Sequence, residues 1–167
     1  MNPYKLGRTE SAHDYIGVLF RAVLAACVLV VILYTFFPAW YKFLAPIVWL
    51  NNSVLIWTGI GLLVISLLWI LIAQSNMGRS WRIGVDADVK TDLIQGGFFS
   101  ISRNPIFLGM RAMLIGFFFI LPNALTFTTW LLGDALMQIQ VRLEEAHLRK
   151  LHGDIYNAYA RRVRRWL

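Results

Sequence analysis

Two long apolar blocks constrain the fold of this chain more than any other feature. Residues 16–37 and 54–73 each approach the ~20 residues that a helix needs to cross ~30 Å of hydrocarbon. The second block contains no charged residue, and the first contains only Arg21, one turn inside its start, where an arginine snorkels to the headgroups. Over the whole chain 58% of residues are hydrophobic and 15% are charged, whereas soluble domains are roughly half apolar and a quarter charged. The sequence predicts an all-α, polytopic membrane protein.

Two further apolar segments complete the predicted membrane domain. Residues 105–121 and 125–140 are separated by Pro122-Asn123, a pair of turn-forming residues, and therefore form a helical hairpin. With the first two blocks they make about four transmembrane helices in a single domain of residues 1–167. Residues 38–53 contain two prolines and several aromatic residues, which is typical of an interfacial segment rather than of a further span.

The end of the chain is predicted to leave the membrane. The fourth helix continues into water as far as Gly153, because glycine is the common residue after a helix C-terminus. Asp154 then caps a short terminal helix over residues 155–165. Ile155, Tyr159 and Val163 lie on one face of that helix.

The basic residues predict the orientation. The chain has a net charge of +7 and 16 Lys and Arg residues. Of these, 13 (16 − 3) lie in the N-terminal tail, in residues 74–104 and in residues 141–167. Four spans place these regions on one side, and the positive-inside rule makes that side cytoplasmic. We expect a multi-pass protein of a bacterial inner membrane or its equivalent, with both termini cytoplasmic.

Some partners and sites are not expected. Cys27 is the only cysteine, which excludes an intrachain disulfide and a cysteine metal cluster. Asp86 and Asp88 lack further ligands at a suitable spacing, so we expect no metal site. The basic residues 161–165 are most simply an anchor to anionic lipid. No nucleic-acid partner is expected, because no recognised binding motif accompanies the charges.

The hairpin predicts which polar residues meet. Both helices rise ~1.5 Å per residue, so residues equally far from Asn123 lie at similar depth. Arg103 lies twenty positions before Asn123 and Glu144 twenty-one after it. The glycine-rich loop and the pair Glu144-Glu145 should therefore meet at the cytoplasmic surface. Asn104 and Arg142 fall in the same layer.

Two charged residues fall inside the bilayer by the same count. Arg111 stands twelve positions from Asn123 and Asp134 eleven. An ion in hydrocarbon costs roughly 2.5–3.5 kcal/mol on insertion scales and usually faces a partner or a cavity. We predict that Arg111 pairs with Asp134 or lines the ligand cavity. In the alternative, Arg111 snorkels and Asp134 bonds only to backbone or water.

Two motifs, in order, resemble a known group of membrane enzymes. The first reads Leu93-Ile94-x-x-Gly97-x-Phe99-x-x-x-Arg103-Asn104-Pro105-x-Phe107-x-Gly109, and the second reads Glu144-Glu145-x-x-Leu148 followed by Gly153, Tyr156, Tyr159 and Val163. Together they resemble isoprenylcysteine carboxyl methyltransferases and phospholipid N-methyltransferases, in which a helical hairpin also separates the motifs. The resemblance covers about residues 75–167. Taken alone, Glu144-Glu145 could equally be a solvated helix face paired with Arg149 and Lys150.

The resemblance implies transfer of a methyl group from S-adenosylmethionine to a lipophilic or small-molecule acceptor at the cytoplasmic interface. No G-x-G-x-x-G follows a predicted strand, so the cofactor would bind without a dinucleotide-binding domain. We hypothesise that Arg103 or Arg142 holds a carboxylate and that Glu145 takes part in catalysis. The cofactor-binding residues would be Gly97, Phe99, Asn104, Phe107, Leu108, Gly109, Glu144, Glu145 and Tyr156.

The chain departs from that pattern at three positions, and two other functions stay open. Asn104 stands where many members have histidine, and it cannot be a titrating base. Phe99 and Phe107 stand where tyrosine is usual, which removes two hydroxyls. The alternatives are an NADPH-dependent membrane reductase of the sterol-reductase type and a non-catalytic module that binds lipid or a protein partner.

Overall fold

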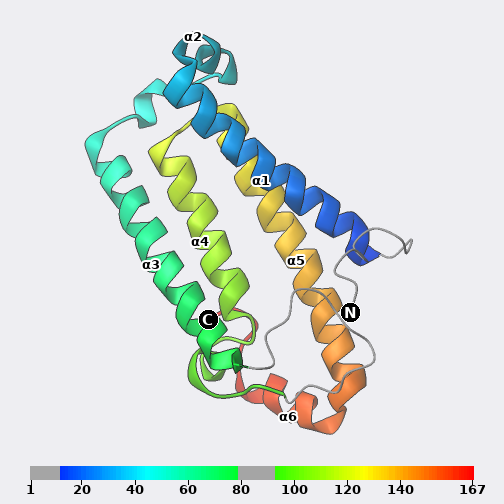
Figure 1. The fold of residues 1–167 in the computed structure, drawn as a ribbon. Helices are drawn as coiled ribbons and strands as arrows, with labels where there is room; N and C mark the ends of the chain where they lie inside the picture. The colour runs from blue at the N-terminus through cyan, green and yellow to red at the C-terminus, as the bar shows by residue number, and fades with distance from the viewer. Residues whose placement is uncertain (1–11, 79–92) are drawn as a thin grey trace.

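The computed structural model describes residues 12–78 and 93–167, and these residues are helical with no strand among them. Four long helices run along the molecule: α1 (Ala12–Phe36), α3 (Ser53–Met77), α4 (Pro105–Ile120) and α5 (Ala124–His152). α3 lies beside α4, and α1 lies beside α5 (Figure 1). The short helix α6 (Asp154–Arg162) lies across one end of the bundle. The all-α prediction is confirmed for this part of the chain.

α1 and α3 have the length and composition of membrane spans. Tyr15–Phe36 and Ser53–Met77 reach mean hydropathies of 2.8 and 2.5, yet only 17% and 11% of their most apolar windows are buried. Apolar side chains that face outward suit a bilayer rather than the core of a soluble protein. α4 is apolar but has only 16 residues. Among the described residues, α5 does not combine the length and the hydropathy of a membrane span. The four-span arrangement and the single domain of residues 1–167 therefore stay predictions.

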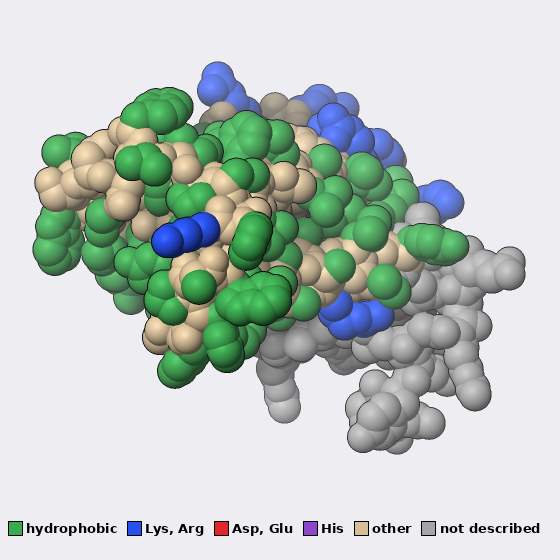
Figure 2. Space-filling view, turned by 90° about the horizontal axis from the view of Figure 1, so that it is seen from above, with side chains coloured by type: hydrophobic (Ala, Val, Ile, Leu, Met, Phe, Trp, Pro, Cys, Tyr) green, Lys and Arg blue, Asp and Glu red, His purple; other side chains and the backbone are tan. Residues whose placement is uncertain are grey.

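The segment between α1 and α3 is broken into short helices. These are α2 (Pro38–Tyr41), η1 (Lys42–Leu44) and η2 (Val48–Leu50). Ile47 N donates to Pro122 O at 2.8 Å, which fastens this segment to the turn of the α4–α5 hairpin. Hydrophobic side chains cover much of the end of the molecule at α2 (Figure 2). This arrangement suits an interfacial segment.

The α4–α5 hairpin turns where the sequence predicts. Asn123 caps α5 by accepting from Thr126 N at 3.0 Å, while Asn123 N donates to the Thr126 hydroxyl at 3.2 Å. This reciprocal pair is a capping box. α5 then runs without a break to His152, and Gly153, with φ +53°, ends it as predicted.

Small residues allow α3 and α4 to approach closely. A Cβ built at Gly59 would lie 2.6 Å from Gly116 O, and one at Gly116 would lie 2.9 Å from Gly59 O. Close backbone contact at glycines is a recurrent feature of membrane helix pairs. Gly61 has nothing within 4 Å of a built Cβ, so Gly59 alone of these two glycines of α3 serves this contact.

The terminal helix differs from its prediction. α6 begins at Asp154 and ends at Arg162, and Asp154 makes no side-chain cap. Ile155 is 61% exposed and Val163 is extended, so the predicted face of Ile155, Tyr159 and Val163 is wrong. The helix ends early because Arg103 N donates to Arg164 O at 2.9 Å and draws the chain toward the start of α4.

Part of the predicted cytoplasmic segment 74–104 lies outside the described residues. This part is residues 79–92. It includes Asp86 and Asp88, so the expectation that they form no metal site concerns residues outside the described part of the chain. Residues 93–104 are described and contain the short helix η4 (Gly97–Ser100) directly before α4.

Candidate functional site

A buried carboxylate joins the two sequence motifs. Glu145 on α5 is 4% exposed. Its Oε1 accepts from Arg103 Nε at 3.2 Å, from Arg103 Nη2 at 3.1 Å and from Asn104 Nδ2 at 3.2 Å. Arg165 also donates to Glu145, from Nε to Oε1 at 3.1 Å and from Nη2 to Oε2 at 2.8 Å. The structure confirms that the loop before α4 meets Glu145, as equal depth in the hairpin predicts.

Arg103 connects the beginning of α4 to the end of the chain. Its Nη1 donates to Ala160 O at 2.8 Å and to Val163 O at 3.2 Å. With the two bonds to Glu145, most of its N–H groups are already used. Arg103 therefore holds three elements together, and little of its hydrogen-bonding capacity remains for a ligand.

Residues 163–166, which we call the C-terminal strap, turn back against the bundle. Ser102 Oγ and Asn104 Nδ2 donate to Arg165 O at 3.2 and 3.3 Å. The guanidinium of Arg165 binds Glu145, so the assignment of this residue to a lipid-anchoring basic end is wrong. Arg164 is exposed. No local pattern in the sequence signals the inward position of Arg165, because it depends on contacts with α4 and α5.

The predicted pair inside the hairpin is present. Arg111 Nε donates to Asp134 Oδ1 at 2.5 Å. The strap contacts this pair at Arg111, whose Cζ lies 4.5 Å from the centroid of the Trp166 ring in a cation–π contact. The two side chains keep 26% and 30% exposure. The prediction that Arg111 pairs with Asp134 is confirmed, and this pairing neutralises its charge.

The glycine-rich loop is held by α3. Phe98 N donates to the Asn76 side chain at 2.9 Å, and the Phe98 ring stacks on Trp69 with centroids 4.2 Å apart. Gly97 has φ +58°, and a Cβ there would lie 2.1 Å from Asn76 Oδ1. Only glycine fits this position without strain. Sequence reasoning missed Asn76 and Trp69, because neither belongs to a recognisable motif.

The tyrosines of α6 differ in their bonding. Tyr159 is 3% exposed, and its hydroxyl donates to Phe99 O at 2.6 Å. Tyr156 is 1% exposed, and its hydroxyl has no partner among the described residues. Burial, followed by the charge of Glu145, raises the pKa of Tyr156 to about 12. Burial, followed by Tyr156, raises the pKa of Tyr159 to about 12, so both side chains are neutral near pH 7.

The neighbouring carboxylates also differ. Burial acts to raise the pKa of Glu145, but the Arg165 hydrogen bond and the charges of Arg103 and Arg165 outweigh it and lower that pKa. Burial, followed by the charge of Glu145, raises the pKa of Glu144. Glu144 forms no ion pair or side-chain hydrogen bond with the part of the chain that is described. Among the described residues, Glu145 is thus saturated with hydrogen bonds, and Glu144 has no charged partner.

The remaining site residues of the sequence prediction do not join the Glu145 cluster by hydrogen bonds. Arg142 is exposed and donates to Gln138 O at 2.8 Å. Gly109 faces α3, where a Cβ would lie 2.6 Å from Ile70 Cγ1. Phe107 and Leu108 are half-buried in α4. The cofactor role of Gly109, Phe107 and Leu108 stays a prediction.

Two described groups near Glu145 have hydrogen-bonding capacity that the described residues do not use. The buried Tyr156 hydroxyl needs a partner, because an unsatisfied buried group costs ~1–3 kcal/mol. Glu144 offers a carboxylate to an ammonium or to hydroxyls. No group of three or more His, Cys, Asp or Glu suited to a metal occurs in the described ranges.

A family model described as phospholipid methyltransferase matches residues 54–155. The match includes α3, α4 and α5, the whole of the first motif, and the second motif as far as Gly153. No curated protein and no solved structure matches the chain.

Proposed function

The chain belongs to the phospholipid methyltransferase family, and we propose that it transfers a methyl group from S-adenosylmethionine to a lipophilic acceptor at the cytoplasmic membrane surface. The observation that carries this proposal is the Glu145 cluster. It joins the two motifs of the family through Arg103 and Asn104, beside the unpartnered Tyr156 hydroxyl.

Glu144 and Tyr156 are the residues that we propose hold the cofactor. S-adenosylmethionine supplies an electrophilic methyl group on a sulfonium centre. The Glu144 carboxylate binds its ammonium or ribose hydroxyls, and the Tyr156 hydroxyl gains the hydrogen bond that it lacks among the described residues. Gly97, Phe99, Phe107, Leu108 and Gly109 shape the cavity around them, with aromatic faces toward positive charge.

Arg103, Asn104 and Glu145 act in positioning. Their side chains are bonded to one another and to the strap, so they fix the geometry in which the ligand groups are presented. Of the two arginines that the sequence predicts to hold a carboxylate, the other is Arg142, which is exposed. We assign Arg142 to the carboxylate of the cofactor, or to a carboxylate or phosphate of the acceptor.

The chemistry requires alignment more than a strong base. Methyl transfer needs the acceptor atom, the methyl carbon and the sulfur in line, and correct orientation supplies much of the rate in such reactions. Asn104 does not titrate, and the pKa of Tyr156 and Tyr159 is about 12. These residues therefore orient the ligands or their neighbours by hydrogen bonding, and they do not serve as bases near pH 7.

The proposed site is consistent with a four-span arrangement in the membrane. Four spans at about 16–37, 54–73, 105–121 and 125–140 place residues 74–104 and 141–167 in the cytoplasm, with both termini. A polar donor then arrives from water, and a lipophilic acceptor arrives from the bilayer. Both meet at the layer of Glu145.

Isothermal titration of the detergent-purified protein with S-adenosylhomocysteine and with NADPH tests this proposal. We expect saturable binding of S-adenosylhomocysteine and none of NADPH. Glu144→Gln should weaken that binding about tenfold, and the exposed Asp154→Asn is the matched control. Binding of NADPH alone would support the reductase, and binding of neither ligand would support a non-catalytic module. Unchanged affinity in Glu144→Asp and Glu144→Gln would remove Glu144 from the site.

A further inference from the structure

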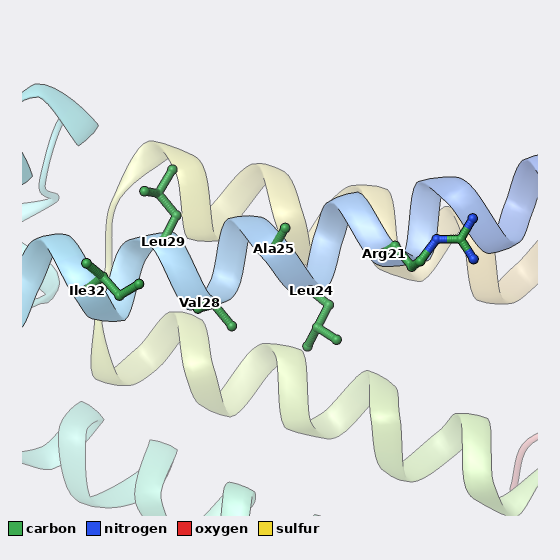
Figure 3. Close-up of a pocket in the computed structure, with 6 residues that line it drawn as sticks. All are labelled: Arg21, Leu24, Ala25, Val28, Leu29 and Ile32. Atoms are coloured by element: carbon green, nitrogen blue, oxygen red, sulfur yellow. The ribbon is translucent and has the colours of Figure 1, made fainter.

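A shallow groove, open to the outside and lined by α1 alone, runs along the outward face of that helix, away from the Glu145 cluster. Its volume is about 530 Å³. It is lined by Arg21, Leu24, Ala25, Val28, Leu29 and Ile32 (Figure 3). The buried residues Ile16, Val23 and Val30 repeat every seven positions on another face of α1, where α1 packs on α5. The groove is therefore separate from the helix contact that holds α1 in place.

The groove is apolar along its length and charged at one end. Leu24, Val28 and Leu29 are 65%, 51% and 46% exposed, which is the exposure of side chains that face lipid. Arg21 lies at the end nearer the start of α1, and its side chain extends in that direction (Figure 3). None of the ion pairs among the described residues includes Arg21. A cation at the polar end of an apolar stripe is suited to bind the phosphate of a membrane lipid.

The length of the groove fits one leaflet. Arg21 and Ile32 are eleven residues apart, which is about 16 Å of helix at ~1.5 Å per residue. Half of a ~30 Å hydrocarbon core is similar. An acyl chain that starts below a phosphate bound to Arg21 therefore ends near Ile32.

We propose that this groove binds one anionic phospholipid of the cytoplasmic leaflet, with its phosphate on Arg21 and one acyl chain along Leu24, Val28 and Ile32. Charge complementarity favours a lipid without an amine headgroup, because such an amine competes with Arg21 for the phosphate. The bound lipid supplies the counter-ion that Arg21 lacks within the described fold.

A second copy of the chain fits this face less well. A two-fold dimer uses the same patch on both subunits, and parallel membrane helices would bring the two Arg21 side chains to the same depth. Like charges in a medium of low dielectric repel strongly. The lipid removes this problem, whereas the dimer creates it.

Native mass spectrometry of the detergent-purified chain tests the proposal, with phosphatidylglycerol and diacylglycerol of equal chain length as probes. We expect one phosphatidylglycerol per chain, retained at least about tenfold better than diacylglycerol. Arg21→Gln should reduce this retention about fivefold, consistent with ~1 kcal/mol for one basic residue near the membrane surface. Arg21→Lys should restore most of it.

Two matched variants separate the groove from general effects. Val28→Trp fills the groove and should displace phosphatidylglycerol, whereas Leu67→Trp on the exposed face of α3 should not. Lys42→Gln removes a basic residue elsewhere and should leave retention unchanged. Equal binding of diacylglycerol, indifference to both Arg21→Gln and Val28→Trp, or a dimer that Val28→Trp dissociates would overturn the proposal.

Discussion

At the scale of single residues, the site contains one saturated carboxylate and two polar groups without partners. Glu145 receives hydrogen bonds from three side chains, so its role is to hold the loop and the strap in place. Glu144 and the Tyr156 hydroxyl have no such partners among the described residues. A folded protein usually satisfies its buried polar groups, so the buried Tyr156 hydroxyl is a candidate for ligand contact, and the half-buried Glu144 carboxylate is the candidate beside Glu145.

Tyr156→Phe should raise stability and lower cofactor affinity together. The substitution removes an unsatisfied buried hydroxyl, so we expect the free energy of unfolding to rise by about 1 kcal/mol. S-adenosylhomocysteine should bind about tenfold more weakly. Thermal unfolding and titration calorimetry measure the two effects. Tyr159→Phe is the control: it loses the bond to Phe99 O and should destabilise the protein by about 1 kcal/mol. Tyr156→Phe with lower stability and unchanged affinity would contradict the assignment.

The ion pairs of Glu145 should make the stability of the folded chain fall at acidic pH. The ion pairs with Arg165 and Arg103 hold the pKa of Glu145 in the folded chain below the usual value of a glutamate. Its contribution is therefore complete above that value and is lost as the pH falls through the folded pKa. Thermal unfolding should show a falling Tm in this range. Glu145→Gln should lower the Tm near pH 7 and flatten the acid limb, whereas Asp154→Asn should leave the limb unchanged. An acid limb that persists in Glu145→Gln would assign it to other groups.

At the scale of elements, the site depends on two irregular segments rather than on a long helix. The loop before α4 is fixed by Asn76 and Trp69 of α3. The C-terminal strap is fixed by Ser102, Arg103 and Asn104. Each segment presents backbone groups to the other, so both must be in place for Glu145 to be saturated.

Gly97→Ala should disturb the site while Gly96→Ala should not. At Gly97 an alanine meets the Asn76 side chain and a positive φ, and a left-handed conformation alone costs roughly 1–2 kcal/mol. We expect a loss of about 2 kcal/mol in unfolding free energy and weaker S-adenosylhomocysteine binding. Gly96 has φ −94° and open space around it, so its variant should behave as the unmodified protein. Equal behaviour of the two variants would show that the loop does not hold this conformation.

The sequence predicts the helices better than the irregular segments, for a physical reason. Apolar length and periodicity set α1, α3 and the α4–α5 hairpin, and equal rise on two antiparallel helices brings Arg103 toward Glu145 and Arg111 toward Asp134. The end of α6 and the position of Arg165 depend on strap carbonyls that accept hydrogen bonds from residues 102–104 and on the bonds from Arg165 to Glu145. Such contacts between distant segments leave no local pattern, so the strap was predicted as a helix and a lipid anchor.

At the scale of the whole molecule, we expect both ends of the chain on the same side of the membrane as the site. α1 and α3 each have the length of a span, and the α4–α5 hairpin returns the chain to the same end (Figure 1). The exposed Lys42 and Lys150 lie at opposite ends of this arrangement. Labels placed at these two positions therefore test the orientation that the positive-inside rule predicts.

Single-cysteine variants test this topology. In a Cys27→Ala background, Lys42→Cys should react with a membrane-impermeant maleimide added outside intact cells. Lys150→Cys should react only after the membrane is permeabilised. The chain without cysteine is the control for background labelling. Labelling of both positions from the same side would contradict the four-span arrangement and the cytoplasmic site.

The central claim is methyl transfer at the Glu145 layer, and transfer of a radiolabelled methyl group tests it most directly. The purified chain in lipid vesicles is incubated with labelled S-adenosylmethionine and a total membrane-lipid extract, and label is counted in the organic phase. We predict incorporation that rises with enzyme and time, falls at least about tenfold in Glu144→Gln and persists in Asp154→Asn. Binding of S-adenosylhomocysteine with no label in any lipid or small-molecule fraction would contradict the claim, as would label that is unaffected by Glu144→Gln and Tyr156→Phe.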